Sequence, residues 1–287
     1  MMPATDLARR AHRTLGKASR VVTVPTRRYR DLPDFLIIGA QRCGTTSMYR
    51  YLERHPAVAP AVLRKGVHYF DLKYTRGDAW YASHFPSRPY RAMLSKRAGQ
   101  RVLTGEGSPY YLFHPAVPSR VAATIPNVRL IVMLRDPISR AFSHYQHELA
   151  RGFESLRFED ALKMEEERLA GEAERLCADP SYHSFGHEHH SYASRGIYID
   201  QLRRWMELFP QDQILIVDSG DFFARPEPAY GAVLDFLGLR NHSLRRYPSH
   251  NAHRYERMSE GARAFLEAVF DEPNRALTAF LGRAFSW

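Results

Sequence analysis

The 287-residue sequence has only two cysteines, Cys43 and Cys177. They provide neither a disulfide framework nor a CxxC metal-binding pattern, and free cysteines are typical of a reducing compartment. The chain also lacks any uncharged apolar run of about 18 residues, the length that a membrane-spanning helix needs. We therefore expect a cytoplasmic protein with no integral membrane segment and no required metal.

Acidic residues are outnumbered, with 31 Asp and Glu against 41 Lys and Arg, so the net charge is +10. This balance favours an anionic ligand such as a phosphate, a sulfate, a nucleic acid or an acidic glycan. Residues 1–33 are basic, but no apolar core follows their charges as a secretory signal requires. We interpret 1–33 as a basic N-terminal arm, with a membrane-surface or targeting role as the alternative, and 34–287 as one domain.

Apolar runs alternate with helical patterns, and internal repeats and low-complexity linkers are absent. This predicts an α/β fold with a central parallel sheet flanked by helices. Continuous apolar runs predict buried strands at 35–40, 128–137 and 213–222. Helical spacing of apolar residues predicts helices at 46–56, 138–152, 158–171, 198–210, 229–239 and 261–282.

The stretch "DFLIIGAQRCGTTSMYRYL" (34–52) nearly spells a nucleotide-binding P-loop. Gly39 and Gly44 have the P-loop spacing, but Thr45 stands where a Walker A loop has the lysine that bridges the β- and γ-phosphates. A strand, a glycine turn and a helix start still present N–H groups to an anion. The predicted anion-binding residues are Arg42, Cys43, Gly44, Thr45, Thr46 and Ser47.

A second anion site is predicted in "LRDPISRAFSHY" (134–145). Arg135 ends a predicted strand, where open α/β sheets bind ligands, and Ser143 lies about two helical turns further on. An arginine and a hydroxyl together suit a phosphate. Beside the first loop, this pair predicts a ligand with two separated phosphate-like groups.

The motifs "LIIGAQRCGTTS", "GVHYFD", "GEGSPYYL" and "IVMLRDPISRAFSHYQHE" resemble, in order and spacing, those of PAPS-dependent sulfotransferases. The likeness is greatest to the carbohydrate group that contains heparan sulfate 3-O- and N-sulfotransferases. It implies 3′-phosphoadenosine 5′-phosphosulfate (PAPS) as sulfate donor, with the 5′-phosphosulfate at the first loop and the 3′-phosphate at Arg135 and Ser143. Tyr198, Arg254 and Tyr255 would then lie near the nucleotide.

The sequence departs from this family at the residue expected to be the general base. The similar heparan sulfate enzymes have a glutamate where this chain has Gly66, and glycine cannot take a proton. His68 is the first candidate to replace it, because its usual pKa suits a base at neutral pH; Glu106 is the alternative. The resemblance also implies that His68, Asp71 and His147 contact the acceptor, and that Gly107 stands where relatives have a lysine.

The predicted reaction is transfer of a sulfuryl group to a hydroxyl of a carbohydrate, glycolipid or glycosylated small molecule, with an amine as the less favoured acceptor. A P-loop kinase or NTPase is a rival, since the run ending at Asp218 resembles a Walker B strand. A non-catalytic polyanion-binding protein is another, although the spread of basic residues favours an enzyme over a nucleic-acid partner. The histidines within 181–196 favour a loop over the acceptor cleft rather than zinc ligands.

Overall fold

Five parallel strands form a central sheet in the computed structural model, which describes residues 29–62, 64–249, 257–285 and 287. The strand order is β2-β3-β1-β4-β5. The strands are β1 (Phe35–Gly39), β2 (Val58–Pro60), β3 (Leu103–Gly107), β4 (Arg129–Leu134) and β5 (Ile214–Asp218). Every neighbouring pair is parallel, so the predicted α/β fold with a parallel sheet is confirmed.

Two of the three predicted strands, β1 and β4, are buried on both faces, and the third, β5, is partly buried. All five residues of β1 are buried, as are five of the six in β4, which explains their continuous apolar runs. Two further strands, β2 and β3, were not predicted. β3 contains two glycines, and a Cβ at Gly105 would lie 2.5 Å from the Phe35 carbonyl oxygen of the neighbouring strand.

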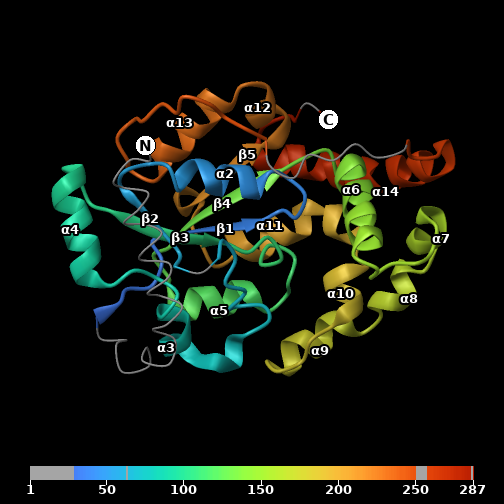
Figure 1. Ribbon diagram of the computed structural model, residues 1–287. Helices are drawn as coiled ribbons and strands as arrows, with labels where there is room; N and C mark the ends of the chain where they lie inside the picture. The colour runs from blue at the N-terminus through green and yellow to red at the C-terminus, as the bar shows by residue number, and fades with distance from the viewer. Residues whose placement is uncertain (1–28, 63, 250–256, 286) are drawn as a thin grey trace.

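Helices cover both faces of this sheet (Figure 1). In Figure 1, α2, α12 and α13 lie on one side and α5 on the other, while α6 to α10 extend beyond the carboxyl ends of the strands. The α-helices are α2 (Thr45–Leu52), α3 (Gly77–Ala82), α4 (Arg88–Ala98), α5 (Val117–Thr124), α6 (Pro137–Ala150), α7 (Phe158–Lys163), α8 (Glu165–Leu169), α9 (Glu172–Ala178), α10 (Phe185–His189), α11 (Tyr198–Met206), α12 (Ser219–Ala224), α13 (Pro226–Phe236) and α14 (Glu260–Leu281). Short 3₁₀ turns lie at Tyr74–Arg76, Ser194–Gly196 and Gln211–Gln213.

The predicted helices are confirmed with one correction, and one predicted strand is shorter than expected. The helix predicted at 158–171 is two short helices, α7 and α8, which meet at Met164. The strand predicted at 213–222 ends at Asp218, because the Asp218 side chain accepts hydrogen bonds from the N–H groups of Gly220 and Asp221 and starts α12.

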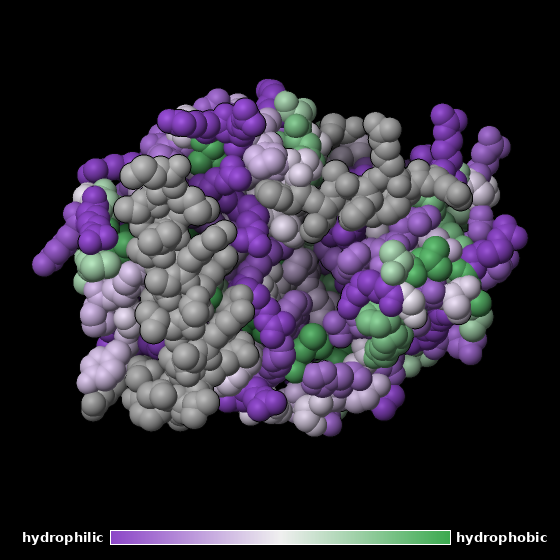
Figure 2. Space-filling model, in the orientation of Figure 1, coloured by the Kyte–Doolittle hydropathy of each residue, from purple (hydrophilic) through white to green (hydrophobic). Residues whose placement is uncertain are grey.

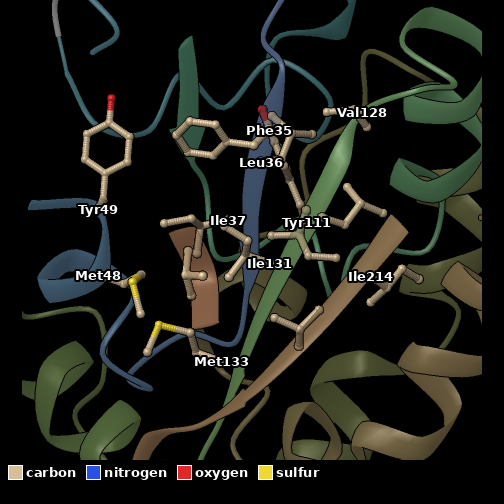
Figure 3. Packing of buried hydrophobic residues seen from close by; sticks show 14 of the residues in the cluster. Phe35, Leu36, Ile37, Met48, Tyr49, Tyr111, Val128, Ile131, Met133 and Ile214 are labelled. Atoms are coloured by element: carbon tan, nitrogen blue, oxygen red, sulfur yellow. The ribbon is translucent and has the colours of Figure 1, made fainter. Parts of the chain in front are cut away.

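The main hydrophobic core lies between the sheet and its helices (Figure 3). Side chains of β1 and β4, such as Ile37 and Met133, pack against helix residues such as Met48. A second cluster joins α6, α7 and α14 through residues that include Tyr145, Phe158 and Leu266. The second cluster fixes α6 beyond the carboxyl end of β4, where its exposed side can contribute to a site.

The chain crosses from one half of the sheet to the other at β1. It passes from β1 through α2 to β2 on one side, and later from β3 through α5 to β4 on the other side of β1. A reversal of this kind opens a crevice at the carboxyl ends of the strands. Among the residues that the structure describes, no helix is long and apolar enough to span a membrane.

Candidate active site

A cavity of about 780 Å³ lies at the carboxyl ends of the strands. Its walls come from the loop after β1, the segment 64–68, the end of β3 and helices α6, α10 and α12. Figure 2 shows hydrophilic side chains gathered around a hollow near the middle of one face. The predicted residues that line the cavity are Arg42, Gly44, Thr45, Thr46, His68, Arg135, Ser143 and His147.

The loop after β1 has the geometry of an anion cradle. Gly44 adopts a left-handed conformation (φ 85°) as the N-cap of α2, a conformation that favours glycine. Thr45 and Thr46 then begin the helix with their hydroxyls at the cavity. The Ser219 hydroxyl donates a hydrogen bond of 2.6 Å to the Cys43 carbonyl and ties the loop to α12.

Three predicted nucleotide contacts point into the protein instead. Cys43 is fully buried with its Sγ 3.8 Å from the Tyr198 hydroxyl, and burial raises the pKa of the thiol to about 11. Ser47 is buried and outside the cavity lining. Tyr198 is a core residue whose hydroxyl donates to the Arg135 carbonyl at 2.9 Å. Cys43 and Ser47 can therefore contact a bound nucleotide only through backbone groups. Tyr198 acts instead by holding the backbone of Arg135.

Helix α6 brings the second anion site to the first. Asp136 caps α6 by accepting from the Ile138 and Ser139 N–H groups, and this starts the helix directly after Arg135. Arg42 donates its Nε–H to the Ser143 hydroxyl at 3.1 Å. The two predicted phosphate sites are thus joined by one hydrogen bond.

Beyond the contact between Arg42 and Ser143, one face of α6 lines the cavity in the direction of α10. Ser143, His147 and Arg151 lie four residues apart, so they share a helix face, and all three line the cavity. Cationic and imidazole groups therefore extend from the phosphate loop along the cavity wall.

His68 faces the loop from the opposite wall. Its Nδ1 lies 2.8 Å from Asp71 Oδ2. A carboxylate only accepts, so Nδ1 carries the proton and Nε2 keeps the lone pair. Burial lowers the pKa of His68, but the charge and hydrogen bond of Asp71 outweigh it and hold the pKa above 6.5.

Gly66 leaves the space that His68 uses. A Cβ at position 66 would lie 3.2 Å from His68 Nε2, so the imidazole stands where a side chain at 66 would begin. The segment is not a strand, and His68 has a left-handed backbone (φ 56°). This turn brings the His68 ring beside position 66.

Glu106 lies behind the cavity wall and outside its lining. Its carboxylate accepts from the Val67 N–H at 2.7 Å and from the Ser108 hydroxyl at 2.6 Å, and also from the hydroxyls of Tyr81 and Tyr111. Burial raises the pKa of Glu106, while these hydrogen bonds oppose the rise. The geometry disfavours Glu106 as a base and gives it a role in holding the backbone before His68.

The structure places at the loop one further residue, Lys65, that the sequence patterns did not indicate. Lys65 donates from Nζ to Thr45 Oγ1 at 2.9 Å and to Thr46 Oγ1 at 3.2 Å. It lies directly before the motif "GVHYFD" that contains His68, and this position was the only signal in the sequence.

The profile of the family described as "Sulfotransferase domain" matches residues 32–268. This chain belongs to that family. A membrane-associated sulfotransferase, kil1 of Dictyostelium discoideum, is 26% identical over 89% of this chain and 66% of its own length. The human heparan sulfate glucosamine 3-O-sulfotransferase 3B1 is 32% identical over 74% of this chain and 47% of its own. The chain therefore spans about two thirds of the first relative and about half of the second.

A solved structure shows the same fold. The sulfotransferase from Alicyclobacillus acidocaldarius superposes with a TM-score of 0.65 and is 26% identical, covering 89% of this chain and 98% of that one. The predicted resemblance to sulfotransferases of the carbohydrate group is confirmed by these comparisons together.

The remaining predictions about this sulfotransferase domain have mixed outcomes. The segment 181–196, expected as a loop over the cleft, contains α10, in which His187 and His189 are buried, and the 3₁₀ turn Ser194–Gly196. His189 contacts Glu148, and His187 contacts Tyr110. No group of three or more potential metal ligands occurs within the described ranges. Arg254 and Tyr255 lie outside the described residues.

Proposed function

We propose that this sulfotransferase domain transfers a sulfuryl group from PAPS to a hydroxyl of a carbohydrate, glycolipid or glycosylated small molecule. One observation carries the proposal: a cradle for anions and an oriented imidazole face each other across one cavity. The similarity to a heparan sulfate sulfotransferase supports a carbohydrate acceptor.

The residues present suit a donor with two phosphate-like groups. The start of α2 offers N–H groups and the hydroxyls of Thr45 and Thr46, and Arg42 adds a cation. Arg135 lines the same cavity, and its side chain makes no hydrogen bond or ion pair with other described residues. Phe223 presents a ring that is 44% exposed beside Gly44, where a purine could stack.

Bound PAPS would supply the sulfuryl group, whose S–O bond to the 5′-phosphate breaks as the acceptor oxygen bonds to sulfur. His68 Nε2 would take the proton of the acceptor hydroxyl, and Asp71 would stabilise the imidazolium. Arg42 and the loop N–H groups would stabilise the negative charge that develops on the leaving oxygen. The chain thus contributes positioning and charge stabilisation, as in phosphoryl transfer.

The proposal is tested by calorimetry with adenosine 3′,5′-bisphosphate (PAP), the desulfated product, and with ATP plus Mg²⁺. We expect metal-independent PAP binding, followed by transfer of label from PAPS to members of an acceptor panel. Binding of ATP with Mg²⁺ in place of PAP would favour a P-loop kinase. The structure disfavours that rival, because Asp218 is buried and caps α12.

Replacing Arg135 with alanine is expected to weaken PAP binding by about tenfold to a hundredfold. The substitution removes a charge-assisted contact to the 3′-phosphate, worth about 1.5–3 kcal/mol. Ser143→Ala removes a neutral hydroxyl and is expected to cost less. Calorimetry measures both, with the exposed Arg263→Ala on α14 as the control. Wild-type affinity in both site variants would exclude the 3′-phosphate assignment.

A further inference from the structure

The side chain of Lys65 crosses the cavity wall to the phosphate loop. Its Nζ contacts the hydroxyls of Thr45 and Thr46, the first two residues of α2. The N–H groups of a first helical turn have no partner within the helix and face any anion bound there. The ammonium therefore lies beside the place that an anion on this loop would occupy.

Gly107 creates the passage for this side chain. A Cβ at Gly107 would lie 2.8 Å from Lys65 Cε and 3.6 Å from its Cγ. The Gly107 N–H also donates to the Lys65 carbonyl at 2.9 Å, which fixes the two backbones side by side. The residue type at 107 thus determines whether Lys65 can reach the loop.

The surroundings of Lys65 destabilise its charged form relative to an exposed lysine. Burial lowers the pKa of Lys65 to about 7, and the Arg50 charge on α2 adds to this effect. Glu53 after α2 and Glu106 on β3 oppose it, and the cations Arg42 and Arg64, with His68, line the same cavity. A bound anion would raise the pKa of Lys65, so the protonated lysine is the binding form.

We propose that Lys65 is a catalytic residue that contacts the 5′-phosphate oxygen to which the sulfuryl group of the donor is bonded, reaching the phosphate loop through the space left by Gly107. The proposal rests on the function proposed above. Two N–H groups of the ammonium contact the threonines, and the third would contact the donor. As the S–O bond to the 5′-phosphate breaks, its electron pair stays on the phosphate oxygen. Lys65 keeps its proton and stabilises that charge, while the acceptor proton goes to His68.

The first test is Lys65→Met, which keeps an apolar stem over Gly107 and removes the charge. We expect PAP binding at pH 6.5 to weaken by about tenfold to a hundredfold and kcat to fall by about 10²–10³. Lys65→Gln, which can still hydrogen-bond to the threonines, should bind PAP as weakly as Lys65→Met. Wild-type PAP affinity in either folded variant would overturn the proposal.

A matched control separates this contact from general charge. Arg76, on the Tyr74–Arg76 turn, is exposed and lies outside the cavity lining. Arg76→Met removes the same charge and should weaken PAP binding by no more than about threefold. A loss equal to that of Lys65→Met would show a nonspecific charge effect and overturn the assignment.

The dependence on pH gives a second readout. Above pH 7 the empty wild-type site must gain a proton to bind PAP, and the methionine variant has no such requirement. The ratio of the variant's Kd to the wild-type Kd should therefore fall by about tenfold or more between pH 6.5 and 8.5. A constant ratio would contradict the role of the ammonium.

Gly107→Ala tests the passage itself. The added methyl group meets the flexible end of Lys65, so it should displace that side chain with little loss of stability. We expect several-fold weaker PAP binding in the wild-type background and no added loss in Lys65→Met. Equal losses in both backgrounds would overturn the proposed route. A wild-type protein that fails to bind PAP would instead reject the proposed function itself.

Discussion

Replacing His68 with alanine is expected to lower kcat by about 10²–10⁴ while PAP affinity stays within about twofold. Asp71 contacts Nδ1 of His68 at 2.8 Å, which leaves the lone pair on Nε2 of a side chain that lines the cavity, as the proposed base requires. His68→Gln keeps a similar volume but cannot accept a proton at neutral pH, so it should be as inactive. Steady-state kinetics with labelled PAPS measures both variants, and calorimetry with PAP is the folding control. A near-wild-type rate in His68→Ala would end this assignment.

The pH profile gives an independent check on His68. A general base must be neutral, so kcat/KM should rise with pH through the His68 pKa, which Asp71 holds above 6.5. Asp71→Asn removes the charge that stabilises the imidazolium, so this limb should move to lower pH. If the limb stays in place in Asp71→Asn, the titrating group is not His68.

The alternative that Glu106 is the general base predicts the opposite ranking of the two variants. If Glu106 were the base, Glu106→Gln would be less active than His68→Ala and would remove the pH limb. The structure predicts that Glu106→Gln keeps the limb, because the carboxylate is enclosed by donors and outside the cavity lining. Its effect should be lower stability, since a buried acceptor that holds the backbone of residue 67 is replaced by an amide that also donates.

The sequence predicted the parts of the fold that local pattern controls. β1 and β4 are buried on both faces, so their apolar runs indicated strands. β2 has three residues and includes a proline, and β3 contains Gly105 and Gly107, so neither has a strand pattern. The pairing of β3 with β1 and of β2 with β3 is a tertiary effect: Gly105, for example, is required by the close approach of Phe35 on β1.

The site was predicted less completely, for the same reason. The spacing predicted that Arg42, Gly44 and Thr45 lie together, because they share one turn. It also predicted that Arg135 lies near Ser143, because Arg135 directly precedes the helix that carries Ser143. Lys65 was missed because its contact with Thr45 depends on a third segment of the chain. There Gly107 has no side chain to block the path of the lysine. A motif shows which residues are neighbours in sequence, but it does not show which side chain fills the space that a glycine leaves.

The second large effect is expected at Arg42. Arg42→Ala should lower kcat by about 10²–10³, because it removes the cation of the loop where charge develops on the leaving oxygen. PAP affinity should also fall, since Arg42 joins the loop to Ser143 on α6 through a hydrogen bond of 3.1 Å. Loss in both parameters distinguishes Arg42 from His68, whose replacement is expected to affect kcat alone.

The backbone of Arg42 makes alanine the right comparison. Arg42 has φ 69°, a left-handed conformation that costs energy for any residue with a Cβ. Alanine keeps that cost, so the thermal unfolding midpoint should change little and the kinetic loss reports the guanidinium. Arg42→Lys keeps the charge but cannot make the same Nε contact with Ser143, so it should recover part of kcat and little of the PAP affinity. Full activity in Arg42→Ala would show that the leaving oxygen develops its charge elsewhere in the cavity.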